Sequence, residues 1–356
     1  MRWSYEEQPR SITAVLLLLL TVLSAGGSPL ARSASAGSVL AGSAFGGQES
    51  LAPVLTSPAR TGDGYLGVAV RRAGTLSAAQ TDRAAALRDR LPAGGRDRLD
   101  AVLAAAAPEE QGYLAAAFAA GHPVAEVASF AATIAGRSPY WLRSRLRPVA
   151  ATGAGAVRFR GNRIGQYNDT TCGSTVVLAA RMSVDPLYAL YVTTGGRPGT
   201  VEESDERFLR RLREEEQRIH DETDVLWPQV AGTPPWGLSE RLNRDPAALG
   251  GRYRWRPALP VAGVNRALLR QALTEANRGF PVPMLIGDLV PRHYVLLLRH
   301  DDAGAWFYEP TAGEIVIVPG PDLERRDFDR LGYPRLAGVI LPSAGSDRRQ
   351  RGLHSR

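Results

Sequence analysis

The chain has 356 residues, 44% of them hydrophobic, so it is long enough for at least one domain with a sizeable buried core. Its formal charge of +7 suggests an anionic partner, yet all 43 basic residues are arginines, and they are interspersed with acids, as in residues 203–222. This run indicates the solvated face of a helix rather than a track for phosphates. No nucleic-acid-binding motif is present, so nucleic acid is excluded as the expected partner.

The first 36 residues have the pattern of a targeting segment. An apolar run at 12–23, ITAVLLLLLTVL, has the length of the hydrophobic part of a signal peptide and is short for a bilayer span. Ala34 and Ala36 form an A-x-A pattern of the kind found at cleavage sites. We therefore expect a secreted protein. The alternative is an uncleaved anchor that tethers the chain to the outer side of the membrane through residues 11–25.

Residues 37–73 are predicted to be a linker, and an Ala-rich helical region follows at 74–150. Ser77 is positioned as the N-cap of its first helix, and His122 lies in a loop between two helices, where we expect a surface or capping role. Gly and Pro divide the region into four predicted helices, at 75–91, 96–106, 108–121 and 123–136. The region carries no catalytic pattern and is interpreted as an inhibitory pro-region or a docking domain.

Residues 151–342 are predicted to form an α+β domain, and residues 343–356 a disordered tail. Its helical patterns lie at 172–182, 202–222 and 265–279. The charged helix belongs to a long stretch at 184–262 that is rich in Pro, Gly and Trp. Short apolar runs predict the strands of an antiparallel sheet at 281–288, 292–300, 305–310, 314–319 and 337–342.

Cys172 is the only cysteine in the chain. Exported proteins usually pair their cysteines, but a single cysteine has no partner within the chain. It is therefore a buried inert thiol, an intermolecular bridge or a reactive nucleophile. Its position favours the nucleophile, because it begins a predicted helix behind a polar loop, with Thr170 and Thr171 as candidate N-caps. The positive end of a helix stabilises a thiolate.

Three more residues could complete a thiol active site around Cys172. Gln166, six residues upstream, could supply an oxyanion donor beside the backbone N–H of the cysteine. His293 opens a predicted strand, and Glu309 ends the strand that returns from the turn at 301–304. Pairing about that turn sets position 293 opposite 311 or 312, so the Glu309 carboxylate could reach and orient the imidazole. Alone, each residue is also typical of an ordinary surface or rim position.

Together these residues form the ordered pattern Q-x5-C-G, H-Y-V-x-L and E-P-x-x-G, which resembles papain-like cysteine peptidases. It looks closest to the bacterial peptidase domains that remove double-glycine leaders from bacteriocins. The resemblance covers about residues 157–342. It implies a papain-like fold in which a helical half carrying the nucleophile packs on an antiparallel sheet. By motif, Cys172 is the nucleophile, His293 the base, Gln166 the oxyanion donor and Glu309 the orienting carboxylate, where the family usually has Asp.

The resemblance implies a peptide or protein substrate, no cofactor and no metal. One cysteine and five scattered histidines give no zinc-ligand spacing, and no Gly-rich phosphate loop has the required strand–helix context. Two alternatives use the same residues. The first is a thiol amidase or acyltransferase that acts on cell-wall peptides. The second is a catalytically inactive papain-like binding module. The sequence leaves the oligomeric state open.

Overall fold

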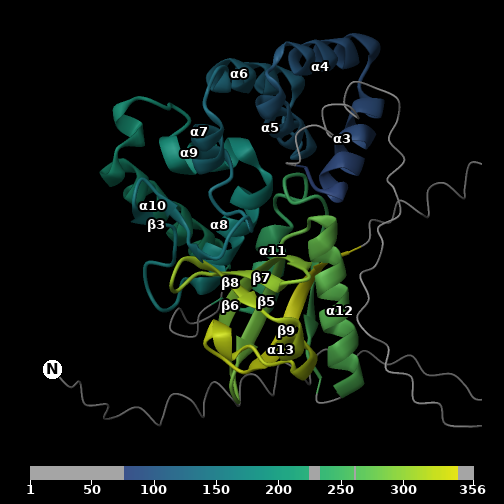
Figure 1. The fold of residues 1–356 in the computed structure, drawn as a ribbon, viewed down its shortest axis with the longest axis vertical. Coiled ribbons are helices and arrows are strands. Elements are labelled where there is room, and N and C mark those ends of the chain that lie inside the picture. The colour runs from purple at the N-terminus through teal and green to yellow at the C-terminus, as the bar shows by residue number, and fades with distance from the viewer. Residues whose placement is uncertain (1–75, 224–232, 260–261, 344–356) are drawn as a thin grey trace, which may run out of the picture. The chain divides into compact units, whose positions relative to one another are not determined.

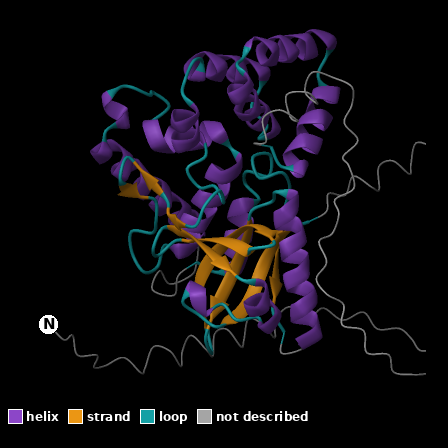
Figure 2. Ribbon diagram, viewed as in Figure 1, coloured by secondary structure: helices purple, strands orange, loops and turns teal. Residues whose placement is uncertain are grey.

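The computed structural model of the protein describes residues 76–223, 233–259 and 262–343 (Figure 1). The predicted targeting segment, the whole of the predicted linker and residues 344–356 of the predicted tail lie outside the described residues. Within them the fold is mixed α+β, with eleven α-helices and a seven-stranded antiparallel sheet (Figure 2). The described residues all belong to one compact unit, so the predicted helical region and the α+β region can be placed relative to each other.

The Ala-rich region forms five helices around its own core. Ser77 caps the first one, because its hydroxyl accepts the Gln80 N–H at 3.2 Å while the Gln80 side chain accepts the Ser77 N–H at 3.0 Å. The third helix is the buried centre of the region and packs its Leu114 and Phe118 against the others. The helices are α3 (Ala78–Arg90), α4 (Ala93–Ala105), α5 (Pro108–Ala119), α6 (Val124–Ile134) and α7 (Pro139–Leu146), the last of which the sequence did not predict.

This region docks on one end of the helix that carries Cys172, α8 (Cys172–Val184), and on the following helix, α9 (Pro186–Thr194). The Gln80 side chain donates to the carbonyl of Val184 at 3.0 Å. His122, expected in a surface or capping role, lies 2.9 Å from Asp185 through its Nε2. The docking therefore involves the C-terminal end of α8, while Cys172 stands at the other end.

Asp185 is the centre of this junction. Its side chain is fully buried, caps α9 through the N–H groups of Leu187 and Tyr188 at 3.1 Å, and pairs with His122 and Arg181. Asp185→Ala is expected to lower the free energy of unfolding by about 3 kcal/mol or more, because it removes the cap of α9 and both ion pairs of a buried carboxylate. Urea denaturation measures the loss. Asp205→Ala, which removes an exposed ion pair with Arg160, should cost less than about 1 kcal/mol. Equal losses would contradict this account.

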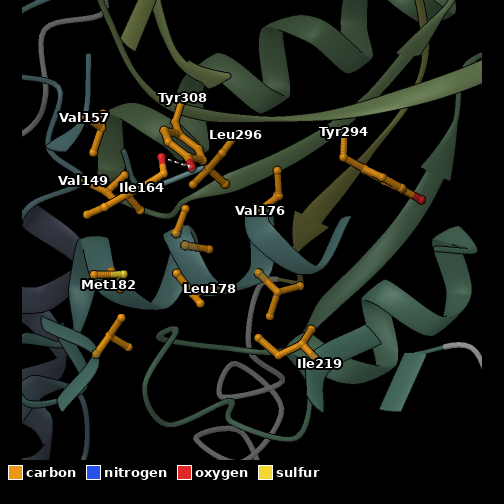
Figure 3. Close-up of a cluster of buried hydrophobic side chains, with 14 of the residues drawn as sticks. Val149, Val157, Ile164, Val176, Leu178, Met182, Ile219, Tyr294, Leu296 and Tyr308 are labelled. Atoms are coloured by element: carbon orange, nitrogen blue, oxygen red, sulfur yellow. Dashed lines mark hydrogen bonds between the residues drawn. The ribbon is translucent and has the colours of Figure 1, made fainter. Parts of the chain in front are cut away.

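Helix α8 is buried on nearly every side, as a helix in the centre of a fold should be. Figure 3 shows Val176 and Leu178 of α8 beneath the sheet residues Leu296 and Tyr308, and the Tyr308 hydroxyl donates to the Ile164 carbonyl at 2.9 Å. The helices that surround α8 are α9, α10 (Asp205–Thr223) and α11 (Pro235–Leu242), with a short 3-10 turn at η1 (Val201–Glu203).

Helix α10 has the predicted solvated face, but its opposite face is buried, which the sequence analysis did not predict. The buried positions recur every three or four residues and place Phe208, Leu212 and Ile219 in the core beside α8. Glu216 and His220 lie on the same buried face. The high charge of the run hid a clear amphipathic period, because acidic and basic residues also occur among the buried positions.

The sheet has the order β1-β8-β7-β6-β5-β9-β4 and every neighbouring pair is antiparallel. Along β6, Tyr294 and Leu296 join the core on the α8 side, while Val295 and Leu297 join the core on the α12 side. The strands are β1 (Gly155–Ala156), β4 (Tyr253–Pro257), β5 (Val282–Gly287), β6 (Pro291–Asp301), β7 (Gly304–Glu309), β8 (Glu314–Val318) and β9 (Arg335–Pro342). The remaining elements are the β2–β3 hairpin (Arg158–Phe159, Asn162–Arg163), α12 (Ala262–Arg278), α13 (Gly320–Arg325) and η3 (Asp329–Leu331).

The five predicted strands are all present, and the predicted meander corresponds to β5 through β8. The last strand, β9, returns to pair with β5, and β4 extends that edge. The described residues of the stretch at 184–262 contribute β4 and three of the α-helices, α9, α10 and α11. Among the described residues, no single helix has the length and hydrophobicity to cross a bilayer, and one bent pair, α8 with α9, passes that test only jointly.

Candidate active site

Cys172 is the first residue of α8 and is 5% exposed. The expected threonine capping does not occur. Thr171 is the N-cap residue but its hydroxyl donates backwards to the carbonyl of Asn168 at 3.2 Å, and Thr170 bonds to the Asn168 side chain. The start of α8 therefore has no side-chain cap. Its backbone N–H groups and the positive end of its dipole lie beside the cysteine sulfur.

Gly173 is required by the packing next to the cysteine. A Cβ atom at this position would lie 2.7 Å from the side chain of Thr233 and 3.2 Å from Leu238. Both contacts come from the region at 184–262, at the start of α11. This region thus lies directly against the helix that begins with Cys172, and the glycine permits the close approach.

His293 and Glu309 meet at the open end of the β6–β7 hairpin. The imidazole Nε2 lies 2.7 Å from Glu309 Oε1, and both side chains are about one-tenth exposed. The observed register, with Leu296 opposite Tyr308, is shifted by a bulge between Leu297 and Arg299. Continuing it sets position 293 opposite 311, within the range that the turn predicted.

Glu309 reaches the histidine by folding its longer side chain over the turn that follows it. Its Oε1 also accepts the N–H of Thr311 at 2.8 Å, and its Oε2 accepts the N–H of Ala312 at 2.6 Å. Burial raises the pKa of Glu309, but the hydrogen bonds from His293, Ala312 and Thr311 outweigh it, so the pKa lies below its usual value. The carboxylate is therefore ionised and held in one orientation.

His293 also neighbours Cys172, close enough for the cysteine side chain to act on the pKa of the imidazole. Because Nε2 is used by Glu309, the nitrogen that remains for the sulfur is Nδ1. Burial alone would lower the pKa of His293, but its neighbours Cys172 and Glu309 raise it to about 9. At neutral pH the imidazole is thus protonated, with one neighbour at each ring nitrogen. Such an arrangement can activate a thiol and deliver a proton to a leaving group.

Gln166 is buried in the loop before α8 and is fastened to the turn after Glu309. Its backbone N–H donates to the carbonyl of Pro310 at 2.9 Å, and Thr311 Oγ1 lies 3.4 Å from its side-chain oxygen. Its amide nitrogen donates one hydrogen to the Asn168 carbonyl at 3.0 Å. The second amide hydrogen is the one that an oxyanion role requires. The loop and the His–Glu hairpin are thus one connected unit.

The four residues selected from the sequence therefore occupy one region, on α8, its preceding loop and the β6–β7 hairpin. A scan against protein-family models finds no match, and a search of curated proteins finds none either. The inference on function rests on this geometry.

Asn168 was missed by the sequence analysis, although it organises the loop between Gln166 and Cys172. Its backbone oxygen accepts hydrogen bonds from the side chains of Gln166 and Thr171, while its side-chain oxygen accepts one from Thr170. The signal was available, because Asn followed by Asp and two threonines is typical of a side-chain-stabilised turn. Tyr333, whose ring centre lies 5.8 Å from that of His293, carried no such signal.

The His, Cys, Asp and Glu side chains of the described residues were also compared with the ligand sets of metal sites. No group of three or more His, Cys, Asp or Glu side chains among the residues of known placement could hold a metal ion. His122 is engaged by Glu126 and Asp185, and His300 lies near the far end of the β6–β7 hairpin.

Proposed function

We propose that the protein is a papain-like cysteine peptidase that hydrolyses a peptide or protein substrate. One observation carries this proposal: Cys172, at the start of a buried helix, neighbours His293, whose ring is hydrogen-bonded to Glu309. The order of these residues in the chain and their similarity to a known peptidase pattern support it further. The predicted export agrees with an extracytoplasmic bacterial substrate.

The reaction follows from the positions of these groups. The Cys172 sulfur attacks the peptide carbonyl carbon, and the oxyanion binds to the backbone N–H of Cys172 and the free amide hydrogen of Gln166. His293 transfers its proton to the leaving amine as the carbon–nitrogen bond breaks, which leaves a thioester on the enzyme. The neutral imidazole then takes a proton from water, whose oxygen attacks the thioester and releases the carboxylic acid and the thiolate. Glu309 holds the ring orientation throughout.

A catalytically inactive module is disfavoured by the contact between Glu309 and His293. That alternative rests on the longer side chain of Glu309, because a Glu in place of the family's usual Asp has to be accommodated before it can orient the histidine. The distance between Glu309 Oε1 and His293 Nε2 is 2.7 Å, so the longer side chain still reaches the imidazole. The carboxylate folds over the turn, where it also accepts the N–H groups of Thr311 and Ala312.

The helical region at 74–150 is better explained as a docking domain than as an inhibitory pro-region. Its hydrogen bonds to the rest of the chain include those to Val184 and Asp185, at the C-terminal end of α8. Thirteen helical residues span about 20 Å, so these contacts lie far from Cys172 at the other end of α8. Inhibition by covering the sulfur would need contacts at the N-terminal end.

The proposal is tested on the mature exported protein with a thiol-directed probe and two substrate sets. Because Cys172 is the only cysteine, iodoacetamide labelling reports on this residue alone. We expect rapid labelling at neutral pH and turnover of linear peptides from a randomised library. Turnover of peptidoglycan fragments with no cleavage of linear peptides would reject the peptidase hypothesis in favour of the amidase. Labelling as slow as that of an ordinary free thiol, with no turnover of either set, would overturn the proposal.

A further inference from the structure

Glu216 is a fully buried acid that the proposed mechanism does not use. It lies on the buried face of α10, and its side chain is directed to the start of α8. Its Oε1 is 3.0 Å from Thr175 Oγ1, one turn after the N-cap of α8. Tyr167, next to Gln166, lies near enough for its pKa to respond to Glu216, and its hydroxyl donates to the neighbouring Gln217 of α10. Glu216 therefore contacts the helix that begins with Cys172 and lies near the loop that carries the oxyanion donor.

The hydrogen bonds of Thr175 indicate which form of Glu216 is present. The Thr175 hydroxyl has one hydrogen and two neighbouring acceptors, the Thr171 carbonyl at 2.8 Å and Glu216 Oε1 at 3.0 Å. If that hydrogen goes to the shorter contact, with the Thr171 carbonyl, Glu216 must be the donor in the second bond. Only a protonated carboxyl group can donate. The network is complete when Glu216 is neutral.

The surroundings of Glu216 agree with a neutral acid. Among the described residues no ion pair involves Glu216, and its Oε2 has no hydrogen-bond partner. Burial raises the pKa of Glu216 to about 8, against weaker lowering by its neighbours. The titratable and charged groups that act on it or respond to it are Arg163 in β3, Tyr167 in the oxyanion loop, Arg213 on α10 itself and Tyr308 in β7.

We propose that Glu216 is a positioning residue that, as a neutral carboxylic acid, holds the Gln166 loop and the start of α8 in their active arrangement. The inference rests on the proposed function for its effect on turnover. Ionisation would place an unpaired charge in the core and break the donor role toward Thr175. The start of α8, into which the loop bearing Gln166 leads, would then lose its hydrogen bond to α10 at Thr175, and the oxyanion donors would lose their alignment with the Cys172 sulfur.

The test compares Glu216→Gln, which keeps a donor and an acceptor but cannot ionise, with Glu216→Ala. We expect Glu216→Ala to lower kcat by about 100-fold with little change in KM, and Glu216→Gln to recover at least tenfold of that loss. In the pH profile of kcat/KM, the wild type should lose activity with an apparent pKa near 8, and Glu216→Gln should lack this step. The control is Glu214→Gln, because Glu214 on the same helix is exposed. An unchanged alkaline step in Glu216→Gln would overturn the inference.

A second measurement reports the protonation state of Glu216 directly on the wild-type protein. It depends neither on peptidase activity nor on the folding of a variant. The infrared spectrum of the wild type at pH 7 should contain the carbonyl band of a protonated carboxylic acid, which disappears with a midpoint near pH 8. Absence of that band would overturn the inference whatever the enzyme does. If the band is present but turnover does not depend on Cys172, Glu216 is neutral as inferred and the proposed function is rejected instead.

Discussion

Replacing Cys172 by alanine is expected to abolish peptide turnover, with kcat reduced by about 10⁴-fold or more. The thiol forms the covalent intermediate, and no other nucleophile among the described residues adjoins His293 in its place. The folded state should persist, because the side chain is small and the surrounding core is formed by α8, α10 and the sheet. Steady-state kinetics with a linear peptide measures the change, and circular dichroism verifies the fold.

His293→Ala should reduce kcat to the same level, and the double variant should be no worse than either single variant, because the two groups act as a unit. The matched control is His300→Ala. His300 lies on the same strand, where its backbone pairs with Ala305, and it is far from the cysteine. Full activity in Cys172→Ala or in His293→Ala would exclude the mechanism. A loss in His300→Ala equal to that in His293→Ala would show that the strand, and not the imidazole, is what turnover requires.

The candidate site was predictable wherever a local sequence pattern fixes the position of a residue. The Cys172 helix follows from apolar spacing after a polar loop, and the meeting of His293 with Glu309 follows from a short hairpin between two apolar runs. Strand pairing transmits such a local pattern over sixteen residues, because register is fixed by the turn and by side-chain alternation. The one-residue bulge in β6 shifted the register without moving the carboxylate out of reach.

Other parts of the site could not be read in this way, because they depend on contacts between distant segments. The attachment of Gln166 to Pro310 and Thr311 joins residues more than 140 positions apart. Thr233 is placed against Gly173 only by the packing of α11. Glu216 was hidden for another reason. It stands in a run of charges that indicates solvent exposure, whereas burial of the α10 face is decided by α8 and the sheet.

Glu309→Gln is expected to lower kcat by about 10³-fold, although the two side chains have nearly the same shape. Both oxygens of Glu309 accept hydrogen bonds, Oε1 from His293 and the Thr311 N–H and Oε2 from the Ala312 N–H. An amide must turn its NH₂ group toward one of these donors. It either leaves the Ala312 N–H facing another donor or presents a donor to the imidazole, which favours the wrong tautomer of His293.

The pH profile distinguishes this loss from a general disturbance of the fold. The Glu309 charge contributes to the raised pKa of His293, about 9, so the imidazole stays protonated through neutral pH and loses its proton as the pH rises through that value. Activity that needs the imidazolium should therefore decline near pH 9 in the wild type, above the step assigned to Glu216. In Glu309→Gln the decline should move to lower pH, because the stabilising charge is gone.

Glu314→Gln is the matched control, because Glu314 pairs with Glu309 across β7 and β8 but belongs to the next strand. Its alkaline limb should stay where it is in the wild type. The rate of Cys172 alkylation against pH gives a second reading that needs no substrate. If Glu309→Gln kept the alkaline limb of the wild type in both measurements, the carboxylate would not act on His293. The site would then be a Cys–His pair, and Glu309 would only stabilise the turn at Thr311 and Ala312.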